Sequence, residues 1–322
     1  MIRSFVFSQG KLVGENLGLD FIKTMLFDDD AQIWVDLENP TDAEATNLLD
    51  QIFNFHPLAI EDCLLVSEQP KIDEYDRYLF MILHAPNFEI KERQFSPVEL
   101  DLFIGKNFLV SFHRAPMQCI ANTIDRIRKN AAAVARAPDR LSYTLIDFLL
   151  DNFEPAVDQI SAEITDMEQN ILSIKATHIL EDVIELKNEV RSVRQIANPQ
   201  REVIGRIARG EFKLVRPHLL PYYRDLLDRL KRTTDLTDMY RESLNNLLQV
   251  HLNLQQMQVN QVIKVLTVLA TLSLPLVAVT SFYGMNFAMP ELKWHYPHLW
   301  VLAITLFFTG MIYLFLKQKK WL

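Results

Sequence analysis

Charged residues are missing from two long runs near the end of the chain. No Asp, Glu, Lys or Arg occurs between Val265 and Tyr283, a run of 19 residues, or between Leu299 and Leu316, a run of 18. A helix needs about 20 mainly apolar residues to cross the ~30 Å hydrocarbon core of a bilayer. Each run is therefore predicted to span a membrane.

The segment between the two runs, residues 284–298, is predicted to turn outside the hydrocarbon because it holds Pro290, Pro297 and charged residues. Basic residues lie mainly at the other side of the predicted spans: three lysines follow the second span in 317–322, and Lys264 precedes the first, whereas the loop has only Lys293. Basic residues close to the spans favour the cytoplasmic side. We therefore expect both termini, and everything before the first span, in the cytoplasm.

Several other absences exclude classes of protein. Cys63 and Cys119, the only cysteines, lie far apart without a CxxC or histidine partner, which predicts free thiols in a reducing compartment. The N-terminus lacks a basic region followed by an apolar segment, so no cleaved signal is expected. A P-loop, HExxH, GxSxG and a strand-linked GxGxxG are all missing, so we predict neither an enzyme nor an organic cofactor.

The net charge of −8 is unevenly placed. Residues 1–137 contain 21 acidic and 13 basic residues, whereas residues 138–322 contain 20 of each. Binding to nucleic acid phosphates requires basic patches, so this balance argues against a nucleic acid partner. It is compatible with the attraction of cations.

Residues 1–137 are predicted to form an acidic α/β domain around a mostly antiparallel sheet. Thr41 and Glu44 are spaced as a helix capping box, residues 105–107 suit a hairpin turn, and Met117–Ala135 reads as a helix. The short apolar or β-branched runs that predict strands are Ile2–Phe7, Ile33–Leu37, Tyr78–His84, Val98–Ile104 and Phe108–Phe112.

Glycine is scarce in the middle of the chain, where only Gly205 and Gly210 occur between residues 139 and 260. The spacing of apolar residues predicts two long amphipathic helices, Asp139–Ile174 and Ile179–Ile196, joined by a loop at 175–178. Their acidic residues form either a solvated face or a surface that collects cations or faces a basic neighbour. These residues are Glu154, Asp158, Glu163, Asp166, Glu168, Glu181, Asp182, Glu185 and Glu189.

Proline and glycine are also missing from a stretch that leads into the first span. No proline occurs between Pro221 and Pro275, and no glycine between Gly210 and Gly284. Apolar residues recur at steps of three and four, so Tyr222–Tyr283 is predicted to be one helix of 62 residues, roughly 93 Å long. Its apolar stripe needs a partner, and the simplest partner is the same helix from other copies of the chain.

One face of the first span is predicted to line a pore if such helices form a ring. Steps of three and four from Asn260 lead to small, apolar and hydroxyl side chains without charge, which also suit close packing of helices. Ile263, Leu266 and Leu274 would form hydrophobic constrictions that gate by dewetting. The face consists of Asn260, Ile263, Leu266, Thr267, Ala270, Leu274, Val277 and Ser281.

The tripeptide Gly284-Met285-Asn286 lies where this pore would meet the outside. Mg²⁺ gives up water slowly, so a selective mouth needs neutral oxygens that bind its water shell, such as the Asn286 carbonyl or backbone carbonyls. The alternative is a plain helix C-cap at Gly284 and Asn286. Asn260 could form a second polar ring at the cytoplasmic side.

These residues also carry a family resemblance. Tyr283-Gly284-Met285-Asn286-Phe287, then Met289-Pro290-Glu291-Leu292, and the final Lys319-Lys320-Trp321-Leu322, resemble the CorA family of divalent-cation channels. The resemblance extends to Lys264–Thr267, Pro221–Asp225 and Gln69–Lys71, so it covers most of the chain. It implies an inner (plasma) membrane protein with an α+β cytoplasmic domain, long helices and a two-span hairpin, assembled as a funnel-shaped homopentamer. It also implies transport of Mg²⁺, and of Co²⁺ or Ni²⁺ as well.

The resemblance assigns roles to particular residues. It makes Gly284-Met285-Asn286 the selectivity motif, Asn260 the pore asparagine, and Ile263 and Leu266 the gate. It implies that cytoplasmic Mg²⁺ bound between protomers at Asp225 and Glu89 closes the channel. Gln249 departs from the family, whose members often carry Asp there.

Two alternatives remain open from the sequence. The ZntB branch shares this architecture and is linked to zinc, usually with GIN in place of GMN, so a zinc or other transition-metal transporter is one alternative. A membrane-anchored metal sensor that does not conduct is the other, although it would need neither the polar face nor the long helix.

The sequence predicts seven consecutive segments. They are the acidic N-terminal domain (1–137), the amphipathic helical hairpin (138–216), the cytoplasmic part of the long helix (217–261), the first span (262–283), the outer loop (284–298), the second span (299–316) and the basic tail (317–322).

Overall fold

The computed structural model of the chain describes all residues except 29, 68, 90–93, 172–178, 287–289, 294, 320 and 322, and the side chains of 87–89, 94–96, 292 and 293 are likewise outside its description. The chain divides into two units, Met1–Leu247 and Leu248–Leu322. The loop expected at 175–178 lies outside the described residues.

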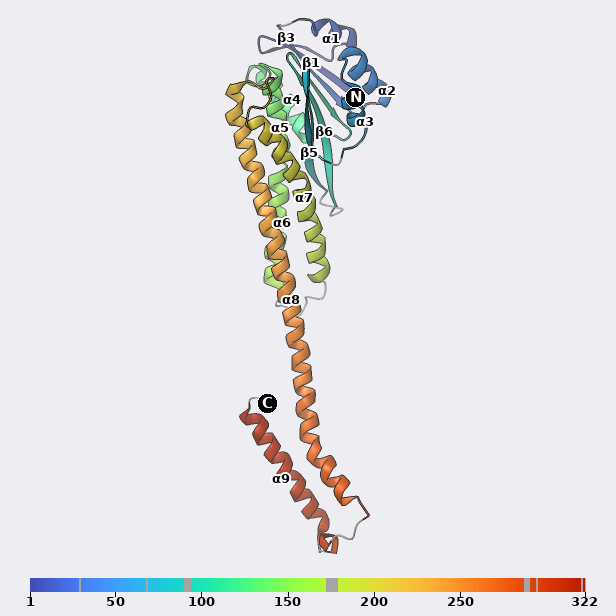
Figure 1. Ribbon diagram of the computed structural model, residues 1–322, viewed down its shortest axis with the longest axis vertical. Coiled ribbons are helices and arrows are strands. Elements are labelled where there is room, and N and C mark those ends of the chain that lie inside the picture. Colours follow the sequence, from blue (N-terminus) through green and yellow to red (C-terminus); the bar gives the residue numbers. More distant parts are fainter. Residues whose placement is uncertain are drawn as a thin grey trace. The chain divides into compact units, whose positions relative to one another are not determined.

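The first unit contains a seven-stranded sheet in the order β2-β1-β3-β7-β6-β5-β4 (Figure 1). Neighbouring strands are antiparallel except β3 and β7, which pair in parallel. This agrees with the mostly antiparallel sheet predicted from the sequence. The strands are β1 (Ile2–Ser8), β2 (Lys11–Glu15), β3 (Ala31–Glu38), β4 (Lys71–Tyr75), β5 (Tyr78–Glu89), β6 (Gln94–Gly105) and β7 (Phe108–His113).

Helices cover both faces of the sheet because its central strands are apolar on both sides. Alternate residues of β3 point to opposite faces, so Ile33 and Val35 join one core whereas Trp34 joins the other. The first core lies under α1 (Leu19–Met25), α2 (Asp42–Thr46), the π-helical η1 (Asn47–Ile52) and α3 (Pro57–Leu64). The other face contacts α4 (Gln118–Val134), α5 (Pro138–Leu150) and α7 (Ile179–Ala208).

The five predicted strands are all present, but β2 and β4 were not predicted. Both are five-residue strands at the edges of the sheet with mostly exposed or half-buried side chains, so they lack the apolar run that marks a central strand. The Thr41–Glu44 capping box and the helix near 117–135 are confirmed. The predicted turn is confirmed as a two-residue connection between β6 and β7.

The predicted helix Asp139–Ile174 is wrong as a single element, because it breaks between α5 and α6 (Phe153–Asn170). Pro155 explains the break, since its ring would clash with the carbonyl of Asp151 and its nitrogen cannot donate. The next helix, α7, continues beyond the predicted end at Ile196 to Ala208 and includes Pro199. Burial of Val203, Ile204 and Ile207 stabilises that extension.

The long helix α8 runs from Leu220 to Tyr283 and confirms the prediction of one continuous helix. At 1.5 Å per residue its 64 residues are ~96 Å long. Its start is held by the short 3-10 helix η3 (Pro217–Leu219) and by Arg216, whose Nη2 and Nε lie 2.6 and 2.8 Å from the buried Asp139 carboxylate.

The second unit comprises the rest of α8, the 3-10 turn η4 (Pro290–Lys293) and α9 (Pro297–Gln318). The two helices qualify as membrane spans by length and composition, each with a mean hydropathy of 2.2 in its most apolar window. Figure 1 shows α9 running back in the direction opposite to the last part of α8. The unit therefore has the predicted arrangement of two apolar helices joined by a short connection.

Candidate functional site

A groove runs along α8 in the second unit and coincides with most of the predicted pore face. Its volume is about 510 Å³. Ile263 and Asn260 lie outside its lining but are also exposed. The groove is lined by Leu266, Thr267, Ala270, Thr271, Ser273, Leu274 and Val277. Five side chains that the sequence placed on one face are thus brought together.

Within the second unit, the buried residues of α8 lie on the side of the helix opposite the groove. Val268 is only 7% exposed, and Pro275, seven residues later and on the same face, is buried as well. On α9, Thr305 and Leu316 are 8% exposed. Leu266 and Leu274, in contrast, are 66% and 60% exposed. The groove face therefore stays open for contact with something other than the chain's own second span.

Of the three hydroxyl side chains that line the groove, those of Thr271 and Ser273 donate to backbone carbonyls of their own helix. Thr271 Oγ1 donates to the Thr267 carbonyl at 2.7 Å, and Ser273 Oγ donates to the Ala270 carbonyl at 2.8 Å. This pattern lets hydroxyl side chains lie in a bilayer without unpaired donors. The face offers acceptor oxygens and small apolar groups, which suits a cation accompanied by water.

Pro275 adds a polar group that the sequence analysis missed. It lies inside α8 and has no N–H to donate to the carbonyl four residues earlier, that of Thr271. Thr271 lines the groove, so a backbone acceptor without its helical donor lies beside it. The proline in an otherwise uninterrupted apolar helix was the available signal.

The Gly284-Met285-Asn286 tripeptide follows the last residue of α8. The Gly284 N–H still donates to the Thr280 carbonyl at 2.9 Å, and the left-handed conformation typical of a glycine C-cap is found at Gly10 and Gly210 but not at Gly284. A Cβ at Gly284 would lie 3.0 Å from the Thr280 oxygen. Glycine is therefore favoured at position 284, because a side chain there would come too close to the Thr280 backbone oxygen. Met285 and Asn286 are exposed, whereas the following Phe287 and Met289 lie outside the described residues.

Of the proposed regulatory pair, Asp225 has a described side chain and Glu89 does not. Asp225 is exposed on α8. Its neighbour Tyr223 is fully buried and lies 3.3 Å from the Ser142 hydroxyl, so the start of α8 is held in a fixed orientation. Glu89 ends β5, but its side chain is not described. The structure therefore supplies a position for only one of these carboxylates.

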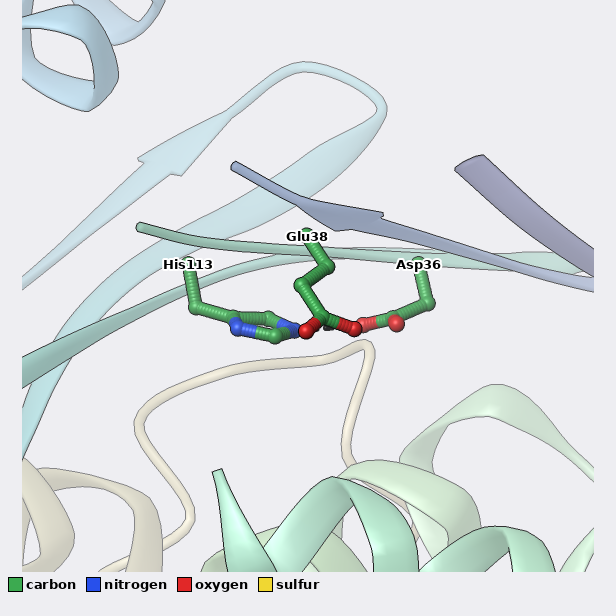
Figure 2. Close-up of side chains that lie close together, drawn as sticks. All are labelled: Asp36, Glu38 and His113. Carbon is green, nitrogen blue, oxygen red and sulfur yellow. Dashed lines mark ion pairs between the residues drawn. The ribbon is translucent and has the colours of Figure 1, made fainter. Parts of the chain in front are cut away.

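One cluster of potential metal ligands occurs among the described residues, and it consists of Asp36, Glu38 and His113 (Figure 2). Arg3 Nη2 lies 2.8 Å from Asp36 Oδ2 and 2.6 Å from Glu38 Oε2. Ser111 Oγ donates to Asp36 Oδ1 at 2.6 Å. The Arg3 guanidinium contacts both carboxylates and offsets one of their two negative charges, and His113 lies beside Asp36, so the cluster is a structural ion network.

His113 completes this network. Its Nδ1 lies 2.6 Å from the Ala115 carbonyl, which can only accept, so Nδ1 carries a proton and Nε2 faces Asp36. Burial lowers the His113 pKa, but the Asp36 carboxylate, 3.3 Å from Nε2, outweighs it and the pKa is raised overall. Burial raises the Asp36 pKa, but His113, Ser111 and Arg3 together lower it below its usual value.

The fold and this groove define a class of protein: a membrane protein with a large α/β body whose long helix continues into the first of two apolar C-terminal helices. The sequence profile of the family described as "CorA-like Mg2+ transporter protein" matches residues 29–318. The chain belongs to this family.

Individual relatives agree. The chain is 31% identical over 294 residues to YfjQ of Bacillus subtilis, covering 91% of each chain. It is 28% identical over 297 residues to the cobalt/magnesium transport protein CorA of Thermotoga maritima, covering 92% of this chain and 85% of that protein. The solved CorA magnesium transporter of Methanocaldococcus jannaschii has the same fold, with a TM-score of 0.83 and 20% identity over 99% of this chain and 98% of that one. The ZntB cytoplasmic domain of Vibrio parahaemolyticus is also similar, with a TM-score of 0.59 and 15% identity over 70% of this chain and 88% of that one.

Proposed function

We propose that five copies of this chain form a channel for Mg²⁺, with the α8 helices around the pore and the α9 helices toward the lipid. As a CorA-family member the chain is a divalent metal ion transporter, and its activity is transport rather than catalysis. The finer proposal is that Mg²⁺ passes with part of its water shell, and that Co²⁺ and Ni²⁺ also pass.

The observation that carries this proposal is the exposed groove on α8. An uncharged face of small, hydroxyl and apolar groups lies opposite the face that the second unit buries. Lipid contact alone requires no such polar groups. A ring of these faces would enclose a narrow water-filled path with hydrophobic constrictions at Ile263, Leu266 and Leu274.

The proposed selectivity site is Gly284-Met285-Asn286 at the outer end of that path. Mg²⁺ dehydrates reluctantly, so the Asn286 carbonyl oxygen is suited to accept hydrogen bonds from its bound water. The basic residues beside the spans support an inner-membrane topology with both termini in the cytoplasm. We further propose that cytoplasmic Mg²⁺ binds between protomers at Asp225 and Glu89 and closes the pore.

A zinc or other transition-metal transporter is the second candidate. The observation that favours it is that Gln249 stands where members of the family often carry Asp, so the chain departs there from the pattern linked to control by Mg²⁺. Met285 in the tripeptide favours magnesium, because the resemblance links the zinc branch to a GIN sequence.

The deciding experiment measures uptake of Mg²⁺ and Zn²⁺ into proteoliposomes side by side, with protein-free vesicles as the control. Saturable Mg²⁺ uptake driven by its gradient alone supports the proposal. Zinc uptake without magnesium uptake would select the second candidate. The native mass of the detergent-solubilised protein should equal five chains, and a monomer or dimer would exclude the pore.

A further inference from the structure

A carboxylate in the first unit is buried without a hydrogen-bond partner. Asp101 on β6 is fully buried, and neither of its side-chain oxygens has a partner among the described residues. Alternate residues of a strand share a face, so Asp101 lies on the same side of the sheet as Glu99 and as Phe103, which belongs to the first core. A negative charge at this position is costly, because burial removes its solvation.

The ionisable groups that act on Asp101 come from three places in the fold. They are Glu99 on the same strand, Cys63 on α3 and Arg114 after β7. Burial and the negative charge of Glu99 raise the Asp101 pKa well above its usual range, and the exposed Arg114 offsets only part of this effect. Burial also raises the Cys63 pKa, so the thiol adds no charge beside Asp101. Asp101 therefore keeps its proton to a higher pH than an exposed aspartate does.

Glu99 in turn fastens the connection between α3 and β4 to the sheet at Ser67. Glu99 Oε2 accepts a hydrogen bond from the Ser67 N–H at 2.7 Å. His84 Nε2 donates to the Ser67 carbonyl at 2.8 Å and lies 3.7 Å from Glu99 Oε2. His84 and Glu99 are paired residues of β5 and β6. Both backbone polar groups of Ser67 are thus held by this pair of side chains.

A cavity of about 600 Å³ adjoins the pair and gives Glu99 room to move. The Glu99 side chain is 15% exposed, whereas His84 is 3% exposed. His113 also lines the cavity, but its ring nitrogens face Ala115 and Asp36. Other parts of the wall are uncharged: Val66, Ser67 and Gln69 from the connection, and Ser192, Gln195 and Ile196 from α7.

We propose that Asp101 and Glu99 together form a proton-binding site that controls the attachment of Ser67 to the sheet. With one proton on the pair, Asp101 is neutral, and Glu99 stays ionised and holds the Ser67 N–H. When the Asp101 O–H bond breaks and the proton leaves to solvent, Glu99 turns into the cavity and releases Ser67. The ligand is the proton itself, so the site responds to the pH around the first unit, and it does not depend on the proposed channel.

The reason for the release is repulsion between two carboxylates on one face of a strand. Like charges that share a site disfavour each other's ionisation, and a low effective dielectric strengthens the effect. A protonated Asp101 can donate to Glu99, whereas an ionised Asp101 can only repel it. Asp101 is fully buried and Glu99 borders the cavity, so Glu99 is the residue that can move toward water.

Hydrogen exchange of the full-length protein in detergent tests the proposal. The peptide that contains Ser67 is followed from about pH 5 to about pH 10 in wild type and in Asp101→Asn, whose amide resembles the neutral acid. The ratio of the wild-type rate to the variant rate cancels the intrinsic effect of pH on exchange. It should rise by about tenfold or more with pH, because only wild type loses the proton. A ratio that does not rise would overturn the proposal, whatever its starting level.

Two further variants show whether repulsion is the cause. Glu99→Gln keeps an oxygen that can accept from Ser67 but removes the charge, so its exchange ratio to Asp101→Asn should stay constant with pH. Glu61→Gln, at an exposed carboxylate of α3, is the matched control and should keep the wild-type rise. A rise that persists in Glu99→Gln, as it would if His84 were the titrating group, would contradict the proposed pair.

Melting temperatures provide a second, independent measurement. The folded-state pKa of Asp101 is raised above 3.8, so the folded state binds more protons than the unfolded state between pH 3.8 and the raised pKa. Wild type therefore loses stability through this group as pH rises, and Asp101→Asn does not. The melting temperature of the variant minus that of wild type should increase with pH, even if the substitution lowers stability overall. A difference that is constant or decreases would show that Asp101 is not the proton site.

Discussion

Nε2 of His113 lies 3.3 Å from Oδ1 of Asp36, and both side chains are fully buried. The two residues come from β7 and β3, which form the parallel pair at the centre of the sheet. Trp34 Nε1 donates to Ser111 Oγ at 3.0 Å, and Ser111 in turn donates to Asp36. Asp36, Ser111 and His113 are all buried, so the loss of one member would leave a buried polar group without a partner.

His113→Ala should lower the free energy of unfolding by about 3 kcal/mol, because it leaves the Asp36 carboxylate buried with one partner fewer. The melting temperature of the full-length protein in detergent measures this. His218→Ala, at an exposed histidine, is the control and should change little. An unchanged melting temperature for His113→Ala would show that Arg3 alone is enough to stabilise the buried Asp36 carboxylate.

The same pair should make stability depend on pH in a defined direction. The His113 pKa is raised from 6.5, so its contribution is complete below pH 6.5 and is lost as pH rises through the raised pKa. The Asp36 pKa is lowered from 3.8, so its contribution is present above pH 3.8 and is lost as pH falls through the lowered pKa. The difference in melting temperature between wild type and His113→Ala should therefore shrink at alkaline pH. A constant difference up to pH 9 would contradict an ionised pair.

Gly284→Ala should reduce Mg²⁺ flux several-fold without dissociating the oligomer. The added Cβ would lie 3.0 Å from the Thr280 oxygen, so the backbone must shift by a few tenths of an ångström at the proposed selectivity site. Gly310→Ala in α9 is the matched control, because its Cβ would meet no atom within 4 Å. Flux from both variants is measured in proteoliposomes. Identical flux from the two variants would show that the backbone at Gly284 can shift without affecting transport.

Asn286→Ala should abolish transport while leaving the assembled mass unchanged. Alanine offers no acceptor for the water shell of the ion. Asn286→Gln, which keeps the carbonyl oxygen on a longer side chain, should retain part of the flux. The measurement is Mg²⁺ uptake alongside native mass. Wild-type uptake by the alanine variant would mean that the tripeptide serves only to end the helix.

Asp225→Lys combined with Glu89→Lys should hold the channel closed when Mg²⁺ is removed. Lysine supplies the positive charge that a bound ion would otherwise place between neighbouring chains. Asp228→Lys with Glu89→Lys is the control, since Asp228 is also exposed on α8, one turn further along. Flux is measured after chelation of Mg²⁺ on the cytoplasmic side. If the Asp225 variant still opens, the regulatory site lies elsewhere, or Gln249 marks a channel without Mg²⁺ control.

Much of the fold follows from local patterns. The capping box at Thr41, the two charge-free runs and the uninterrupted helix before Tyr283 depend on residues close together in the chain, and each is present. The edge strands β2 and β4 were missed because an edge strand is held by backbone pairing with its neighbour and needs no apolar run. Pro155 and Pro199 also show what a local pattern leaves undecided. The helix breaks before Pro155, which lies in the first turn of α6, whereas Pro199 lies inside the continuous helix α7.

The sequence by itself determined that the chain has two membrane spans and which residues share one face of the first span. It also determined where the glycine-methionine-asparagine motif lies. These features follow from helical periodicity and hydropathy, which are local properties of the chain. Only the tertiary structure decided that this face is turned away from the buried side of α8 and opens as a groove, since that depends on how the two helices of the second unit pack. It also decided that Arg3, Asp36, Glu38 and His113 meet, although they are spread over more than a hundred residues. The register of β1, β3 and β7 brings those side chains together, and no pattern within any one strand contains that information.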